Sequence, residues 1–283
     1  MIAQKLYKKL DKDFELDKCK DDWKYLDYNK YISKKFKKRY MGIYLDNSKE
    51  IERIFTAVFP SDLILNKVLE LNEENILIVT HHPMVWDITK KEIFENVNLE
   101  LLPELKKRKI SMYTMHVPLD KNGEYSTTTN LARALDIIPE GEFCEYFGVK
   151  VGIYGKTNLK TPEELANKLS SAIGHRTKLW KYGSDDIKNQ KVAVVAGGGN
   201  EIYIVQEVLD LGINTYVTGI TALNDYSKEV HTFEKENQLN IIGGTHYSTE
   251  KFACIALCKY FENLGLSCEF LEDKPVLEDM DMG

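Results

Sequence analysis

Short apolar runs alternate along the chain with segments of helical pattern, and this alternation restricts the fold more than any other feature. The runs Asn75–Thr80 and Ile110–His116 have the length and composition of strands buried on both faces. Segments of helical character follow them, among them Leu101–Arg108 and Thr127–Leu135. Strands that alternate with helices predict an α/β fold with right-handed crossovers.

The same alternation resumes after Pro139. Phe147–Tyr154 and Lys191–Val195 are predicted strands, and the segment from Thr157 to Ile173 predicts a helix, with a proline near its start and acidic residues in its first turn. We therefore expect an α/β protein with two similar halves, built on mixed or parallel sheets. The predicted halves are residues 1–135, completed by 243–283, and residues 136–242.

Composition and length exclude several classes of protein. The chain has 283 residues, of which 43% are hydrophobic and 29% charged, so it can bury a large core without disulfide bonds. No apolar run reaches the roughly 18–20 residues that cross a bilayer, and the first residues lack the apolar core of a secretory signal. Five unpatterned cysteines indicate reduced thiols. We expect a cytoplasmic protein with no membrane partner.

Charge is unevenly distributed, although the formal total is only −6. Residues 1–40 carry thirteen basic and seven acidic side chains, and residues 269–283 carry one basic and six acidic ones. A basic segment could attract nucleic acid. Because its lysines are interspersed with aspartates, we interpret it instead as a solvated helical face, and nucleic acid is not an expected partner.

Four of the six histidines lie where predicted strands end. His81 and His82 follow Asn75–Thr80, and His116 ends its strand with Asp120 four residues later. His246 stands between the predicted strand 240–242 and the last predicted helix, 248–263, with Glu250 four residues later. Binding sites in open α/β sheets form beyond the carboxyl ends of strands. The other two, His175 and His231, are interpreted as surface residues.

These residue types suit a metal centre. Imidazole nitrogen and carboxylate oxygen together bind zinc, iron, manganese, nickel or cobalt. A single histidine at a strand end is more often a hydrogen-bonded polar residue, but three groups with acids nearby favour metal. His81 and His82 cannot point the same way in an extended chain, so they could bind two different ions. His246 and Glu250 share a helix face only if the helix includes both.

A glycine run, Gly197–Gly199, follows the predicted strand Lys191–Val195. A strand, glycines and a helix start can hold a phosphate. The run has neither the lysine of a Walker loop nor the spacing of a dinucleotide-binding loop. We interpret it as a tight turn between a strand and a helix.

Three segments together resemble the Nif-three-like family of dinuclear metal-centre proteins, some of whose members are named GTP cyclohydrolase I type 2. They are THHPMVWDI at 80–88, HVPLD at 116–120 with TTTNLARAL at 127–135, and GGTHYSTEKF at 243–252. The resemblance extends from about Glu52 onward. It implies two divalent metal ions and a metal site between the halves at the carboxyl ends of strands. The implied ligands are His81, His82, Asp120, His246 and Glu250, with Glu250 as the bridge.

The resemblance also implies a function and an assembly. The expected function is that of a metal-dependent hydrolase of small nucleotide-like or phosphate-bearing substrates, with the chains forming a ring-shaped hexamer. His116 has no ligand role by resemblance, so it is a candidate catalytic proton carrier or a support for the ligands. The basic start of the chain motivates an alternative, a non-enzymatic metal-containing regulatory or interaction protein. The chain departs from the family at Ile220, where an acid usually follows Thr-Gly.

Overall fold

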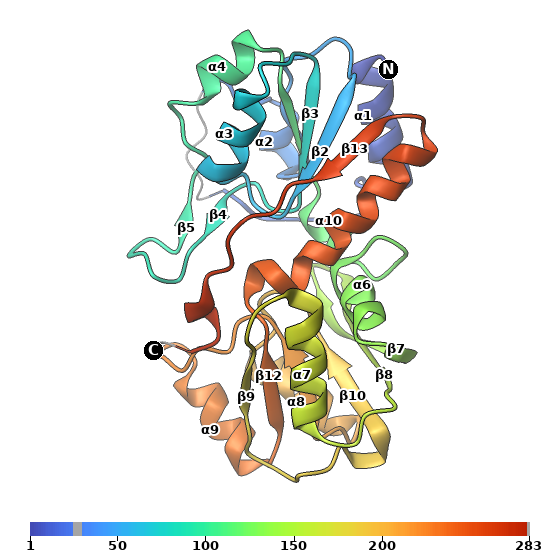
Figure 1. The fold of residues 1–283 in the computed structure, drawn as a ribbon, viewed down its shortest axis with the longest axis vertical. Coiled ribbons are helices and arrows are strands. Elements are labelled where there is room, and N and C mark those ends of the chain that lie inside the picture. The colour runs from blue at the N-terminus through green and yellow to red at the C-terminus, as the bar shows by residue number, and fades with distance from the viewer. Residues whose placement is uncertain (25–29, 282–283) are drawn as a thin grey trace. The chain divides into compact units, whose positions relative to one another are not determined.

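The computed structural model describes residues 1–24 and 30–281, and the chain divides into two compact units. Unit 1 comprises residues 1–120, 147–149 and 254–274, and unit 2 comprises residues 121–146, 150–253 and 275–283. Each unit combines helices with a β-sheet, so the predicted α/β fold class is confirmed (Figure 1). Unit 2 also contains residues 121–135, 243–253 and 275–283, which we assigned to the first half, and Leu131 and Leu135 are buried in its core.

The sheet of unit 1 has five strands. Its order is β1 (Gly42–Leu45), β6 (Ser111–Thr114), β3 (Ile76–Thr80), β2 (Arg53–Ala57) and β13 (Ser267–Phe270). The last four are parallel, and β1 is antiparallel to β6. All residues of β3 and β6 are buried, as expected for parallel strands covered on both faces. Thr80 pairs with Thr114, so β3 and β6 end at the same edge of the sheet.

Helices and a small hairpin complete unit 1: α1 (Ala3–Asp13), α2 (Phe36–Arg39), α3 (Asp62–Glu70), α4 (Leu102–Lys107), α5 (His116–Asp120), and β4 (Val85–Trp86) with β5 (Phe94–Glu95). Ser61 caps α3, since its hydroxyl accepts a hydrogen bond from the Ile64 amide at 3.3 Å. In α1, Leu6 and Leu10 are buried while the lysines are exposed. This part of the basic segment is therefore a solvated helical face.

The sheet of unit 2 is mixed. Its order is β7 (Ile138–Tyr146), β8 (Val149–Lys156), β10 (Lys191–Val194), β11 (Thr215–Thr218), β12 (Asn240–Gly243) and β9 (Lys178–Trp180). The central β10, β11 and β12 are parallel, β8 is antiparallel to β10, and β9 is antiparallel to β12. The pattern did not predict β7 or β9. Both are edge strands without a buried apolar run, and β7 contains Pro139, which an edge tolerates.

The helices of unit 2 begin and end at recognisable residues. They are α6 (Thr127–Ala134), α7 (Pro162–Ile173), α8 (Ile202–Asp210), α9 (Lys228–Glu236) and the first part of α10 (His246–Asn263), with 3₁₀ turns η1 (Lys188–Gln190) and η2 (Leu277–Asp279). Thr161 and Glu164 form a capping box at the start of α7, and Gly174 ends it with φ +86°. Helix α10 begins two residues before the predicted start, which places His246 inside it.

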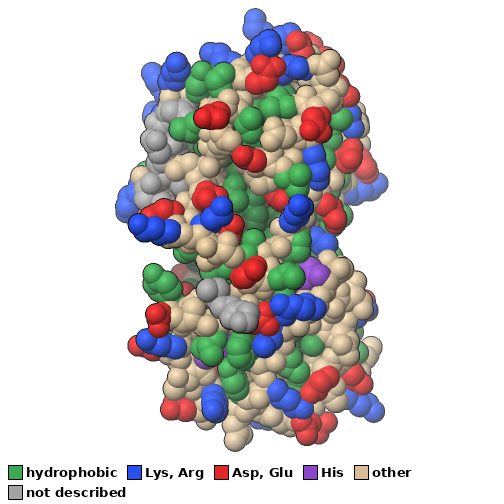
Figure 2. All heavy atoms as spheres, turned by 60° about the vertical axis from the view of Figure 1, so that its left-hand side comes forward, with side chains coloured by type: hydrophobic (Ala, Val, Ile, Leu, Met, Phe, Trp, Pro, Cys, Tyr) green, Lys and Arg blue, Asp and Glu red, His purple; other side chains and the backbone are tan. Residues whose placement is uncertain are grey.

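The surface of the chain carries charges of both signs. Lysine and arginine side chains alternate with aspartate and glutamate over the face drawn in Figure 2. Among residues 1–24 and 30–281, none of the helices combines the length and the apolar character that crossing a bilayer requires. This finding agrees with the apolar runs in the sequence, which are all short.

Candidate metal centre

Three histidines gather at the edge where β3 and β6 end. His81 and His82 directly follow β3, and their amides donate to the carbonyls of Ala57 and Val58 at 3.1 and 2.9 Å, which continues the pairing with the β2 side. His116 begins α5, just after β6. Because β3 and β6 are adjacent parallel strands in register, residues that follow them must lie side by side. We call His81, His82 and His116 the histidine cluster.

The histidine cluster has the geometry of a ligand set. Its side chains are buried, and one nitrogen from each lies within 4.8 Å of the others. The ring centroids of His81 and His82 lie 4.3 Å apart with their planes at 68°, so the two neighbours approach each other, unlike neighbours in an extended strand, because the chain bends at His81 after β3. Phe59 stacks on His82 with centroids 4.8 Å apart. Buried imidazoles that converge in this way could hold a metal ion.

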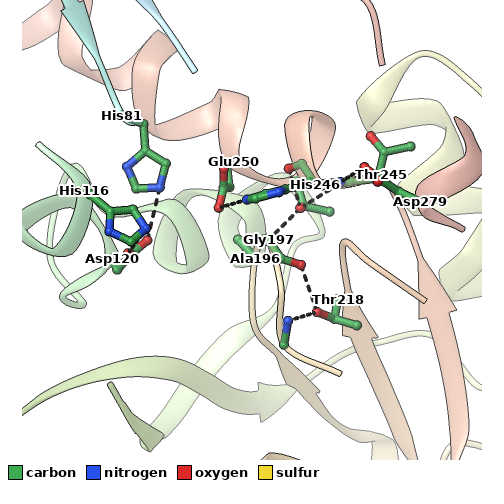
Figure 3. A network of polar contacts seen from close by, with 12 residues as sticks. His81, His116, Asp120, Ala196, Gly197, Thr218, Thr245, His246, Glu250 and Asp279 are labelled. Carbon is green, nitrogen blue, oxygen red and sulfur yellow. Dashed lines mark hydrogen bonds and ion pairs between the residues drawn. The ribbon is translucent and has the colours of Figure 1, made fainter. Parts of the chain in front are cut away.

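Asp120 supplies a carboxylate to the same place. It ends α5, one helical turn after His116, so both side chains lie on one face of the turn. Its Oδ1 is 3.3 Å from His81 Nε2, and its Oδ2 is 3.6 Å from His116 Nε2 (Figure 3). Three imidazoles and one carboxylate make a donor set that suits a divalent transition metal.

Asp21 contacts the candidate site, although the sequence did not indicate it. Its carboxylate lies 3.0 Å from His116 Nδ1, and its side chain is only 1% exposed. The Trp23 ring packs edge-on against His116 at 4.8 Å. Burial opposes the positive charge of an imidazolium, but Asp21 and Asp120 outweigh it and raise the pKa of His116. The only signal in the sequence is the pair Asp21-Asp22 beside a tryptophan, which is too common to be read as a site.

A second group of candidate ligands lies in unit 2, on the first turn of α10. His246 Nε2 is 3.1 Å from Glu250 Oε1, and both side chains are buried (Figure 3). Of the two helix starts that the sequence allowed, the structure has the one that includes His246. The four-residue spacing therefore puts the imidazole and the carboxylate on one face of the helix.

The start of α10 is held by groups distant in the sequence. The His246 amide donates to Asp279 Oδ2 at 2.9 Å, so a carboxylate from η2 caps the helix. Thr245 precedes the helix with φ +67°, an unfavourable conformation for a β-branched residue. The Thr249 hydroxyl accepts a hydrogen bond from the Gly197 amide at 2.9 Å. These contacts set the direction in which His246 and Glu250 project.

The glycine run bends the chain between β10 and α8 and contacts α10 and β11. Gly197 has φ +72°, and a Cβ there would lie 2.1 Å from Glu250 Oε1, so only glycine leaves room for that carboxylate. The amide of Gly199 donates to the Thr218 hydroxyl at 3.1 Å. Because the amides of Gly197 and Gly199 already donate to side-chain hydroxyls, they do not donate to a phosphate. The run lies between a strand and a helix, as predicted, but in a longer connection of residues 195–201.

Comparison with known proteins identifies the family. The sequence profile of Duf34/NIF3 (NGG1p interacting factor 3) matches residues 20–275, which is most of the chain. The chain belongs to the DUF34/NIF3 family.

Relatives of this DUF34/NIF3 chain share its fold over nearly its whole length. Proteins named GTP cyclohydrolase 1 type 2 homolog are 28% identical in Archaeoglobus fulgidus, over 240 residues, and 24% identical in Escherichia coli K12, over 233 residues. Each match covers 82% of this chain and 88% of the relative. Among solved structures, protein ybgI, of unknown function, has a TM-score of 0.75 at 20% identity and covers 97% of this chain and 100% of its own. TTHA1606 of Thermus thermophilus has a TM-score of 0.70 at 22% identity and covers 97% and 99%.

The predicted site residues of the DUF34/NIF3 chain fall into two groups. The structure places His81, His82 and Asp120 together in unit 1, with the candidate proton carrier His116 among them. It places His246 and Glu250 together in unit 2. The described chain thus contains histidine, aspartate and glutamate groups that could hold metal ions.

One sequence interpretation is wrong. His231 is not a surface residue: it is 4% exposed, and its Nδ1 lies 3.0 Å from the Tyr182 hydroxyl and 3.2 Å from Glu234 Oε2. Its Nε2 contacts the Thr221 carbonyl at 3.1 Å. The sequence around it is mostly charged, and the ring packs against Trp180 and Tyr182. His175 is partly buried, and its Nε2 contacts the Ser248 hydroxyl at 2.7 Å.

Proposed function

We propose that this protein is a metal-dependent hydrolase of small nucleotide-like or phosphate-bearing substrates, with two divalent metal ions in each chain. The observation that supports the metal ions is the convergence of His81 and His82, which each bring a nitrogen within 4.8 Å of the other, beside the carboxylate of Asp120. Nitrogen and carboxylate donors suit zinc, iron, manganese, nickel and cobalt. The proposed ligands are His81, His82, Asp120, His246 and Glu250.

Hydrolysis needs a group that carries a proton beside these ligands, and His116 can have this role. Divalent metal ions held by these residues would lower the pKa of a bound water and so supply a nucleophile near neutral pH. His116 is fixed through Nδ1 by Asp21 at 3.0 Å, so its Nε2 can carry a proton to or from the reacting group. The names of relatives, GTP cyclohydrolase 1 type 2 homolog, favour a nucleotide among phosphate-bearing substrates.

Metal analysis of purified variants tests the ligand assignment. We expect the full chain to bind two equivalents of a divalent transition metal, measured by elemental analysis after purification without an affinity metal. His82→Ala and Glu250→Ala should each lose at least one equivalent, because one donor in a set of about four is removed. Circular dichroism should show that both variants remain folded.

A matched control lies on the same helix as Glu250. Glu262→Ala removes an exposed carboxylate from α10 whose nearest cation, Lys259, is 3.6 Å away. It should keep the full metal content. Full metal in Glu250→Ala would contradict its role as a ligand, and a wild-type protein that neither contains nor takes up metal would contradict the whole proposal. Hydrolysis of GTP and of phosphate esters, measured against metal content, then tests the activity.

The alternative, a regulatory or interaction protein that keeps metal for its structure, has support from the exposed lysines of α1. It predicts that the metal-loaded protein turns over no nucleotide or phosphate ester. Turnover that rises in proportion to bound metal would favour the hydrolase.

A further inference from the structure

Two cysteines outside the candidate metal centre face each other in unit 1. Cys258 lies on α10 and Cys268 lies on β13, ten residues later in the chain. Their sulfur atoms are 3.0 Å apart, and both are free thiols. A disulfide bond is about 2.05 Å long, so the two sulfurs need to approach by only about 1 Å. Neither residue has a part in the proposed hydrolysis.

The backbone around this pair is held in place by ordinary packing. Strand β13 pairs in parallel with β2, and Cys268 lies opposite Ile54. Helix α10 is anchored to β2 by two hydrogen bonds. The Thr56 hydroxyl donates to the Cys254 carbonyl at 2.8 Å, and the Cys254 thiol donates to the Ala57 carbonyl at 3.3 Å. One helical turn later, Cys258 therefore lies over β13. The two sulfurs meet because of the fold.

The pair also differs from the other cysteines in accessibility. Cys258 and Cys268 are partly exposed, whereas Cys19, Cys144 and Cys254 are buried. A small oxidant in solution can reach the pair without unfolding the chain. Disulfide bonds that form where thiols are kept reduced are usually transient and have a catalytic or redox-sensing role.

We propose that Cys258 and Cys268 are a modification site that forms a reversible disulfide bond on reaction with a low-molecular-weight disulfide. The Cys258 thiolate attacks one sulfur of the small disulfide and expels one thiolate. The Cys268 thiolate then attacks Cys258 in the mixed disulfide and expels the second. Two protein thiols are oxidised, one small disulfide is reduced to two thiols, and the two protons pass to the expelled thiolates.

The order of attack follows from the hydrogen bond between the two thiols. The bond that Cys268 donates lowers the pKa of the Cys258 thiol, against the effect of burial. The same bond, together with burial, raises the pKa of Cys268. Cys258 therefore has the greater thiolate fraction and reacts first, and Cys268 resolves the intermediate.

Treatment of the folded full-length protein with glutathione disulfide tests this proposal. After alkylation, unfolding and tryptic digestion, we expect residues 252–259 and 260–283 to be recovered as one linked pair that dithiothreitol separates. Cys258→Ser and Cys268→Ser should abolish the link. Because residues 252–259 also contain Cys254, the matched control is Cys254→Ser, which should retain it.

Equilibration in glutathione buffers separates a site built by the fold from chance pairing. The folded protein should form the bond at a thiol-to-disulfide ratio at least about tenfold more reducing than the protein unfolded in urea, because the fold raises the effective concentration of the second thiol. Equal oxidation of folded and unfolded protein would overturn the proposal. So would a stable glutathione adduct on Cys258, or a link through Cys254. None of these outcomes depends on metal binding.

Discussion

Two buried histidines of this protein, each beside a carboxylate, show how the surroundings of a residue decide its role. In unit 2, the Tyr182 hydroxyl, Glu234 and the Thr221 carbonyl contact the two nitrogens of His231. In unit 1, His116 contacts Asp21 and Asp120, but its ring belongs to a set of three imidazoles that converge. The first arrangement completes a packed interior. The second brings together donors that could hold a cation.

Glu234 is a buried carboxyl whose ionisation should oppose folding. Its side chain is fully buried, and this burial raises its pKa above 4.5 although His231 lowers it. Because the pKa of Glu234 is higher in the folded than in the unfolded chain, the protonated carboxyl contributes fully to stability below the unfolded-state pKa. This contribution is lost as the pH rises through the folded-state pKa. Glu234→Gln removes this loss. Relative to the wild type, the variant should therefore gain in free energy of unfolding between pH 5 and pH 8.

Urea unfolding at several pH values measures this difference. The exposed Glu229→Gln on the same helix serves as the control and should show no such trend. A difference between Glu234→Gln and wild type that stays constant with pH, or that falls, would contradict the burial argument.

At the scale of elements, helix α10 carries residues of both proposed sites. Its first turn carries His246 and Glu250, and a later turn carries Cys258. Its amino end is capped by Thr245, whose hydroxyl accepts from the Ser248 amide at 3.2 Å, and also by Asp279, 33 residues away in the sequence. The acidic end of the chain therefore has a structural role at this carboxylate.

Asp279→Ala should weaken the start of α10. It removes a hydrogen bond to the His246 amide and a negative charge at the helix start, which together stabilise a helix by about 1 kcal/mol. We expect a lower urea midpoint and weaker metal binding in a chelator competition, because His246 and Glu250 are oriented by this turn. The exposed Glu278→Ala is the neighbouring control. Unchanged metal affinity in Asp279→Ala would contradict the inference that this cap orients His246 and Glu250.

At the scale of the whole molecule, the chain consists of two α/β units, each with parallel strands at the centre of its sheet. The family match spans both units. We propose that the chains assemble into a homo-oligomer, with a hexamer as the expected state. This proposal rests on the resemblance described above.

Light scattering coupled to size exclusion tests the assembly. A hexamer would have six times the 32.7 kDa mass of the chain. The hydrolase proposal predicts that the mass is unchanged after chelation, since metal is then needed for activity and not for assembly. Dissociation on chelation, restored by added metal, would favour the structural role of the alternative function.

Much of the fold and part of the site could be predicted from the sequence. The buried central strands were found within one or two residues, because a strand covered on both faces must be a continuous apolar run. That His81, His82 and His116 lie at strand ends was also predictable, since parallel strands present their carboxyl ends at one edge. The edge strands β7, β9 and β13 were not predicted, because a strand exposed on one side lacks such a run.

The sequence by itself determined the alternation of strands and helices, the donor types and their positions at strand ends, because these depend on local pattern. Only the tertiary structure decided which distant groups meet. It brought Asp21 to His116 across 95 residues, Asp279 to the amide of His246, and Cys258 to Cys268. It also buried His231 and began α10 at His246. The physical reason is that each of these contacts depends on how elements pack, and packing leaves no periodic trace in the chain.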